Sequence, residues 1–219
     1  MTDQGIPAKS PLLLIHPVGV GLSARFWDRF INHWKETSDE RELIAPDLLG
    51  CGSAPCPRQP LTPDDWAKPL IDLLRRRNSE AVILVSQGAS LPIALALMNS
   101  APELVSGLIA ISPPGWRVLK DSFPLKRSKQ LWNMLFSGII GNVFYRYARR
   151  RSFLKSFSEK NLFARRQDVD EQWLETLHEG SKGMDSRWAV FSFLAGFWRS
   201  GWEATLRAVE IPFLVVFGR

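Results

Sequence analysis

Two serines lie on either side of a glycine in the stretch Ser86-Gln87-Gly88-Ala89-Ser90, between an apolar segment and a helix-like one. A serine hydroxyl becomes a nucleophile when a base such as histidine lies within hydrogen-bond reach and a third group orients that base. Nearby backbone amides then stabilise the negative oxygen that develops during acyl transfer. The residues around Gly88 therefore show whether the chain has a serine nucleophile and nearby backbone amides for acyl transfer.

The chain offers three histidines as candidate bases, and none follows the last predicted strand. His16 ends a predicted strand, and we expect it to brace a loop, with a catalytic role as the alternative. His33 and His178 lie on predicted helices, and we expect both to be surface residues. Asp47 lies in a Gly-rich turn, where a carboxylate usually accepts hydrogen bonds from backbone amides, so we expect a loop-bracing role for it as well.

The composition is that of a globular protein, with 45% apolar and 23% charged residues in a chain of 219. The N-terminus MTDQGIPAKS is polar, unlike a signal peptide. No apolar run approaches the roughly 20 residues that cross a bilayer. Cys51 and Cys56 give neither a disulfide framework nor a metal spacing with the histidines. We therefore expect a cytoplasmic protein with no metal and no cofactor.

Five apolar runs rich in β-branched residues are predicted to be strands, at 12–16, 43–46, 81–85, 108–112 and 212–217. Their near-continuous hydrophobicity favours strands that are covered on both faces. Helical patterns separate the first four: Trp27, Phe30, Ile31 and Trp34 form one apolar stripe, and Thr62 is a predicted N-cap. The sequence predicts an α/β fold with a mostly parallel sheet of about five strands and helices on both faces.

A long helical segment, 113–208, separates the fourth and fifth predicted strands and contains six of the nine tryptophans. It is too long for a simple crossover, so we expect an inserted cap over a core formed by 1–112 and 209–219. Ligands of open α/β sheets bind at the carboxyl ends of the strands, beneath such a cap. We expect a tryptophan-rich underside and a pocket for a small apolar molecule.

Four segments in order resemble the α/β-hydrolase superfamily over nearly the whole chain: PLLLIHPVGVGLSARFW, LIAPDLLGCGSA, APELVSGLIAISPP and IPFLVVFGR. Within the second, Asp47, Gly50, Gly52 and Ser53 are similar to the family's Asp- and Gly-rich turn. The sequence looks closest to the cyanobacterial and plastid members. The resemblance implies a G-x-S-x-G turn, or nucleophile elbow, that holds a strained serine after the third strand.

Glycine occupies the position of that serine, because the elbow aligns with residues 86–90 and places Gly88 at its centre. With this register Pro92 lies in the first helical turn, where amides have no intrahelical partner. If Ser86 were the nucleophile, Pro92 would lie inside the helix at a cost of ~3 kcal/mol. Ser90 also leaves Pro92 early in the helix and remains the weaker alternative nucleophile.

The remaining machinery that the resemblance implies is also altered. Pro17 replaces the glycine of the family's His-Gly pair, but the amides of Val18 and Ala89 could still form an oxyanion-type pair beside Gln87. The chain reaches Arg219 where the family's acid loop would begin, so we expect a degenerate triad, a truncated C-terminus and an uncovered last strand of low stability.

Most of the basic charge lies in the predicted cap. Between Arg117 and Arg166 there are 13 Lys and Arg against 2 Asp and Glu. A cap helix with a solvated basic face explains this pattern, and the alternative is contact with an anionic membrane surface through Arg146, Arg149, Arg150 and Arg151. We expect no nucleic-acid partner, because no recognised binding module accompanies the charge.

These observations favour a hydrolase-derived protein that binds a small apolar ligand under its cap and lacks the usual Ser-His-Asp activity. Two alternatives remain. One is a fragment of an active serine-type hydrolase, and the other is a peripheral membrane or scaffold protein that acts through its basic cap.

Overall fold

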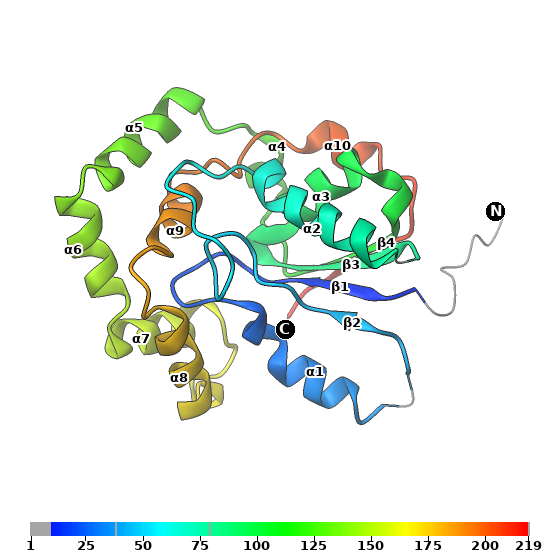
Figure 1. Ribbon diagram of the computed structural model, residues 1–219, viewed down its shortest axis with the longest axis horizontal. Helices are drawn as coiled ribbons and strands as arrows, with labels where there is room; N and C mark the ends of the chain where they lie inside the picture. The colour runs from blue at the N-terminus through cyan, green and yellow to red at the C-terminus, as the bar shows by residue number, and fades with distance from the viewer. Residues whose placement is uncertain (1–9, 38, 79, 219) are drawn as a thin grey trace.

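A five-stranded parallel sheet forms the centre of the protein in a computed structural model, which describes residues 10–37, 39–78 and 80–218 (Figure 1). The strands are β1 (Leu12–Ile15), β2 (Leu43–Ile44), β3 (Val82–Gln87), β4 (Val105–Ile111) and β5 (Phe213–Val216). Their order across the sheet is β2-β1-β3-β4-β5, and every neighbouring pair is parallel. The predicted α/β fold class is confirmed.

Strands β1 and β3 at the centre of the sheet are covered on both faces, which explains why they are apolar without alternation. Leu13 and Leu84 point to the face that α2 (Pro63–Arg77) and α3 (Leu91–Ser100) cover. Leu14 and Ile83 point to the opposite face, against the stripe predicted from Trp27 to Trp34, which forms a short 3₁₀ turn (Ala24–Trp27) and α1 (Asp28–Trp34). Figure 1 shows α1 on one side of the sheet and α2 and α3 on the other.

Helix α2 begins at the N-cap that the sequence predicts. The Thr62 hydroxyl oxygen accepts a hydrogen bond from the Asp65 amide at 3.4 Å, and the Asp65 carboxylate accepts one from the Thr62 amide at 2.8 Å. This reciprocal capping box satisfies amides that the helix itself cannot pair. Trp66, which follows directly, is almost fully buried in the main core.

Thr62→Ala is expected to lower the free energy of unfolding by about 1 kcal/mol, because it removes the oxygen that caps the Asp65 amide. Urea unfolding followed by far-UV circular dichroism measures the change. Thr62→Ser keeps that oxygen and is the matched control. Equal midpoints for the alanine variant and the parent protein would contradict the role of this cap.

Five helices form a cap beside the sheet (Figure 1): α5 (Leu125–Phe136), α6 (Ile139–Ala148), α7 (Arg151–Asn161), α8 (Glu171–Gly180) and α9 (Arg187–Leu194). Its base is closed where Ser122 and Ser200 form an antiparallel bridge. Outside that bridge, Leu119 on α4 (Trp116–Lys120) and Trp202 belong to the main core, and α10 (Glu203–Arg207) contacts α3. The two ends of segment 113–208 therefore pack with the sheet, and its middle forms the cap.

Strand β5 is an edge strand, hydrogen-bonded to β4, and all four of its residues are exposed. Among the described residues, no helix is both long enough and apolar enough to cross a membrane.

Candidate functional site

The turn after β3 has the sharp geometry that the elbow requires. Gly88 has φ = +59° and begins a 3₁₀ turn (Gly88–Ser90), after which α3 starts at Leu91. Pro92 lies in the first turn of α3, where its missing amide costs no hydrogen bond. Glycine adopts this φ freely, whereas a residue with a side chain stores about 1–3 kcal/mol of strain there. A β-carbon added at Gly88 would meet no heavy atom within 4 Å.

Both neighbouring serines are almost fully buried, at 1% exposure. The Ser90 hydroxyl accepts a hydrogen bond from the Gln87 amide at 3.1 Å and donates toward the carbonyl oxygens of Gln87 at 2.9 Å and Ile15 at 3.2 Å. It therefore ties the turn to β1. Ser86 lies within β3, and its hydroxyl has no hydrogen-bond partner among the described residues.

A cavity of about 380 Å³ separates this turn from the cap, in the size range of small-molecule sites. The carboxyl ends of the strands contribute one wall, made of Pro17, Val18, Gly19, Gln87, Gly88, Ala89 and Ser112. The cap contributes an apolar wall that includes Phe144, Phe153, Phe157, Val190, Phe193 and Leu194. The predicted ligand residues Val18, Gln87 and Ala89 are thus brought together, with Gly88 between the last two.

Tryptophans do not line this cavity among the described residues, so the expected tryptophan-rich underside is wrong. Trp132 and Trp188 pack between cap helices, and Trp202 packs in the main core. Indole rings suit such helix contacts because they bury a large apolar area. The Trp188 N–H has no hydrogen-bond partner among the described residues, whereas Trp173 donates to the Ser158 hydroxyl at 2.9 Å.

His16 is fully buried behind the cavity wall and holds two loops. Its Nδ1–H donates to the carbonyl oxygen of Pro17 at 2.9 Å, and its Nε2 accepts from the Leu48 amide at 3.1 Å. These partners require the neutral imidazole. Burial lowers the pKa of His16 to about 4, although the Pro17 hydrogen bond and the Asp47 charge partly oppose the shift. Because both nitrogens are occupied, His16 has none left to act as a base on a ligand.

Asp47 accepts hydrogen bonds from the Ala24 amide at 2.8 Å, the Ser53 amide at 2.8 Å and the Ser53 hydroxyl at 2.9 Å. Partial burial alone would raise the pKa of this carboxyl group, but the three hydrogen bonds outweigh burial, and the pKa is lowered. Asp47 thereby joins the loops that follow β1 and β2.

The other histidines lie outside the cavity. His33 is exposed on α1, with Nδ1 3.2 Å from a Glu36 carboxylate oxygen. His178 was expected at the surface of its helix, but it is half-buried, and its Nδ1 is buried without a hydrogen-bond partner among the described residues. Within the described residues, no group of three or more His, Cys, Asp or Glu side chains could hold a metal ion.

Comparison with known proteins agrees with this architecture. Residues 12–219 match the model of the family described as the alpha/beta hydrolase family. The chain belongs to this family. An esterase from Thermogutta terrifontis has the same fold, with a TM-score of 0.69 and 19% identity over 95% of this chain and 71% of that one.

Two curated relatives of this α/β-hydrolase-family chain come from Pseudomonas. The 2-hydroxymuconate semialdehyde hydrolase of strain CF600 is 29% identical over an alignment of 226 positions that covers 99% of this chain and 71% of that protein. The 2-hydroxy-6-oxo-2,4-heptadienoate hydrolase of Pseudomonas putida F1 is 27% identical over an alignment of 187 positions that covers 75% of this chain and 65% of that protein.

Sequence analysis of this family member does not identify Ser112 as a residue of the cavity wall. Ser112 follows β4, lines the cavity and has φ = +46°, a conformation that serine rarely adopts. Its amide donates to the Val216 carbonyl oxygen at 2.7 Å, so pairing with β5 fixes the backbone there. No local signal in the sequence marks this position, because the constraint comes from a strand about a hundred residues away.

Proposed function

We propose that this α/β-hydrolase-family protein binds a small apolar molecule under its cap and does not cleave it by the usual Ser-His-Asp mechanism. The observation that carries the proposal is the elbow at Gly88, which keeps φ = +59° and faces the cavity without a side chain. In this position a serine would supply the nucleophile. The glycine leaves space for a ligand atom instead.

The cavity walls favour a ligand with an apolar body and one carbonyl or carboxylate oxygen. Phenylalanine and aliphatic side chains of the cap would contact the body. At the sheet end, the Val18 and Ala89 amides would donate to the oxygen. The Ala89 amide lies at the start of a 3₁₀ turn, where amides lack intrahelical partners, and the Val18 amide lies in the loop after β1. Two such donors bind an oxygen atom whether or not a nucleophile lies beside them.

An active serine-type hydrolase is the second candidate, because both curated relatives bear the names of hydrolases. In this reading Ser90 would be the nucleophile. Three hydrogen-bond contacts and near-complete burial work against it, because the Ser90 hydroxyl would have to break its bonds to the turn before it could attack.

Hydrolysis of 4-nitrophenyl butyrate and labelling by a fluorophosphonate distinguish the two candidates. We expect that neither the rate of hydrolysis nor the extent of labelling exceeds the background measured with heat-unfolded protein. Labelling that is retained in Ser86→Ala and lost in Ser90→Ala would establish a catalytic serine and overturn the proposal.

Gly88→Leu is expected to weaken the binding of octanoate, a simple apolar carboxylate, at least tenfold, because its side chain would occupy the cavity beside the two amides. Isothermal titration calorimetry measures the affinity for the parent protein and the variant. A thermal melt must first show that the variant folds, since the positive φ costs about 1–2 kcal/mol.

Gly115→Leu is the matched control, because Gly115 lies outside the cavity lining and a β-carbon there meets no heavy atom within 4 Å. Saturable binding that survives unchanged in a folded Gly88→Leu variant would place octanoate elsewhere. The absence of saturable octanoate binding to the parent protein would also count against a carboxylate site under the cap.

A further inference from the structure

Helix α6 has an apolar surface on its inner side and another on its outer side. On the inner side, Tyr145 is fully buried, and Phe144 and Ala148 line the cavity. On the outer side, Ile139 is 80% exposed and Val143 is 64% exposed. Burial of the inner side explains why the helix packs where it does, but it leaves the outer side unexplained.

The outer side is a continuous patch. At about 100° per residue, Ile139, Ile140, Val143, Arg146 and Tyr147 lie within an arc of about 120°. All five side chains are exposed. We call these five residues the outer face of the cap. Figure 1 places α6 at the edge of the molecule away from the sheet.

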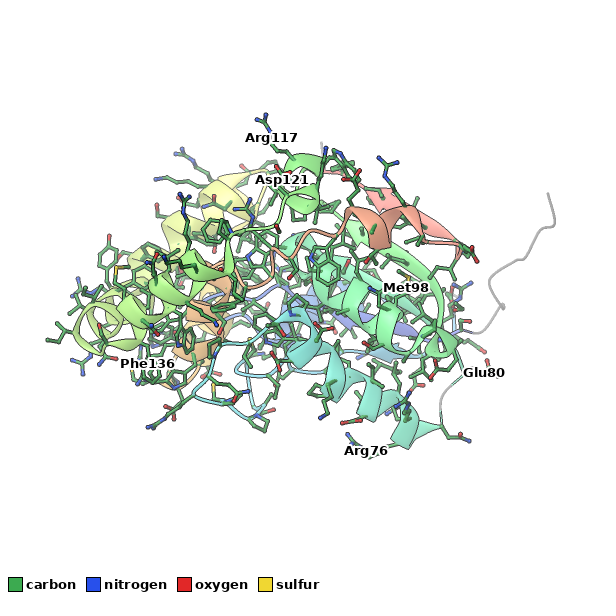
Figure 2. All side chains as sticks on the ribbon, turned by 90° about the horizontal axis from the view of Figure 1, so that it is seen from above. Arg76, Glu80, Met98, Arg117, Asp121 and Phe136 are labelled. Carbon is green, nitrogen blue, oxygen red and sulfur yellow. The ribbon has the colours of Figure 1, made fainter. Side chains whose placement is uncertain are left out.

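Helix α5 also exposes apolar side chains in the cap, on the side of α6 where its last turn packs near Gly141 and Phe136 contacts Trp132 and Trp188. Its last turn carries the exposed side chains of Met134 and Phe136, and only two residues separate the end of α5 from the start of α6. Figure 2 shows Phe136 at the cap end of the molecule, far from Arg76 and Glu80 at the other end. Exposed large apolar side chains grouped in this way mark a contact surface more often than single ones do.

The segment that carries the patch is basic. Residues 125–161 contain nine Lys and Arg and a single acid, Glu159. The four arginines predicted to face a membrane differ in their surroundings. Arg151 pairs with Glu171 and with Glu175, and the Arg149 guanidinium reaches the sulfur of Met184 at 3.4 Å.

Arg146 and Arg150 are both exposed and form no ion pair within the part of the chain that the structure describes. Arg146 lies on the outer face, and the Arg150 guanidinium carbon lies 5.7 Å from the centre of the Tyr147 ring. These two arginines therefore keep their charge available at the border of the apolar patch.

We propose that the outer face of the cap docks on an anionic lipid surface. Ile139, Ile140 and Val143 would enter the acyl boundary, while Arg146 and Arg150 would contact lipid phosphates and Tyr147 would lie at the interface. A second copy of the chain is a poorer occupant, because pairing of two such faces would bring like charges together. An anionic bilayer matches both the apolar centre and the basic border.

The same face leads to the cavity. Tyr147 contacts Phe153, with ring centres 5.3 Å apart, and Phe153 stacks on Phe157 at 6.2 Å. Phe153 and Phe157 line the cavity, and Phe157 is also exposed. This aromatic row would let an apolar molecule pass between a membrane and the cavity under the cap. That consequence rests on the proposed function, but the docking proposal is independent of it.

Vesicle flotation of the protein tests the docking, because aggregates do not float. We expect flotation with phosphatidylcholine vesicles that contain phosphatidylglycerol, little with phosphatidylcholine alone, and loss at high salt. The double variant Arg146→Gln/Arg150→Gln should partition about 30-fold more weakly, at roughly fivefold for each charge. Val143→Glu, which alters an exposed site, should reduce partitioning at least tenfold.

The matched control is Lys68→Gln/Arg76→Gln, which removes two exposed charges from α2, a helix that covers the sheet and is not part of the cap, and should float like the parent protein. Equal weakening by both double variants, or equal flotation with both vesicle types, would overturn the proposal. So would a dimer, detected by light scattering, that Val143→Glu dissociates while the parent protein fails to float, since the face would then be a self-association surface.

Discussion

Gly21→Ala is expected to lower the free energy of unfolding by about 4 kcal/mol, the largest effect that we expect from one methyl group. Gly21 has φ = +75°, which costs a residue with a side chain about 1–2 kcal/mol. The added β-carbon would also overlap the carbonyl oxygen of Leu177. That oxygen accepts a hydrogen bond from the Ser181 amide at 3.1 Å at the end of α8. To remove the overlap, either this hydrogen bond must break or the backbone must shift.

Differential scanning calorimetry should show a melting temperature about 10 °C lower for Gly21→Ala, at roughly 2–4 °C per kcal/mol for a chain of this size. Gly183→Ala is the control, because a β-carbon there meets no heavy atom within 4 Å and should change stability by less than about 0.5 kcal/mol. If Gly21→Ala had the same melting temperature as Gly183→Ala, the loop that contains Gly21 and helix α8 would not approach each other so closely.

This close approach also positions the candidate site. Gly180 lies on the other side of the contact, and a β-carbon added to it would overlap the carbonyl oxygen of Gly21. The two glycines let α8 lie directly against the loop that carries Val18. The cap therefore contacts this loop three residues after Val18, one of the two proposed amide donors.

The sequence predicts the elbow because local rules act there. Pro92 is costly inside a helix and harmless in the first turn, so its position argues against Ser86 and is compatible with Gly88 as the centre of the bend. Strands β1 and β3 are equally accessible to sequence analysis, since burial on both faces leaves a continuous apolar pattern. The structure has Gly88 at φ = +59° and Pro92 in the first turn of α3.

Features that depend on distant contacts could not be predicted in this way. The approach of Gly21 to Gly180 joins segments about 160 residues apart, and each glycine alone is compatible with an ordinary turn. The predicted tryptophan-rich cavity wall was wrong for the same reason. Apolar periodicity shows that a side chain is buried, but it does not show whether that side chain faces a helix or a cavity. Leu119 and Trp202 likewise pack on the sheet although they flank the cap in sequence.

His16 is expected to make the protein less stable as the pH falls from 6.5 to 4, by about 3 kcal/mol. Its pKa is about 4 in the folded protein and about 6.5 in the unfolded chain. Between these values the unfolded state binds a proton that the folded state excludes, so the free energy of unfolding decreases as acid is added. Below pH 4 both states are protonated, and the contribution of His16 no longer changes.

Urea unfolding of the parent protein and of His16→Gln at pH 7 and at pH 4 isolates this contribution. Carboxyl groups titrate in both proteins and cancel when the two pH differences are subtracted. Asp47 contributes mainly below this window, because its folded pKa lies below the usual 3.8, and its stabilisation is lost only as the pH falls through that lower value. The variant should therefore lose about 3 kcal/mol less than the parent protein between the two pH values.

His33→Gln serves as the control, because it removes an imidazole that is exposed on α1 and lies outside the loops that His16 holds. The two variants separate a buried neutral histidine from a general effect of histidine removal. If His16→Gln kept the full pH dependence, the imidazole would already be protonated in the folded protein at pH 6. A protonated Nε2 could not accept the Leu48 amide, so the loop after β2 would have to be held by other contacts.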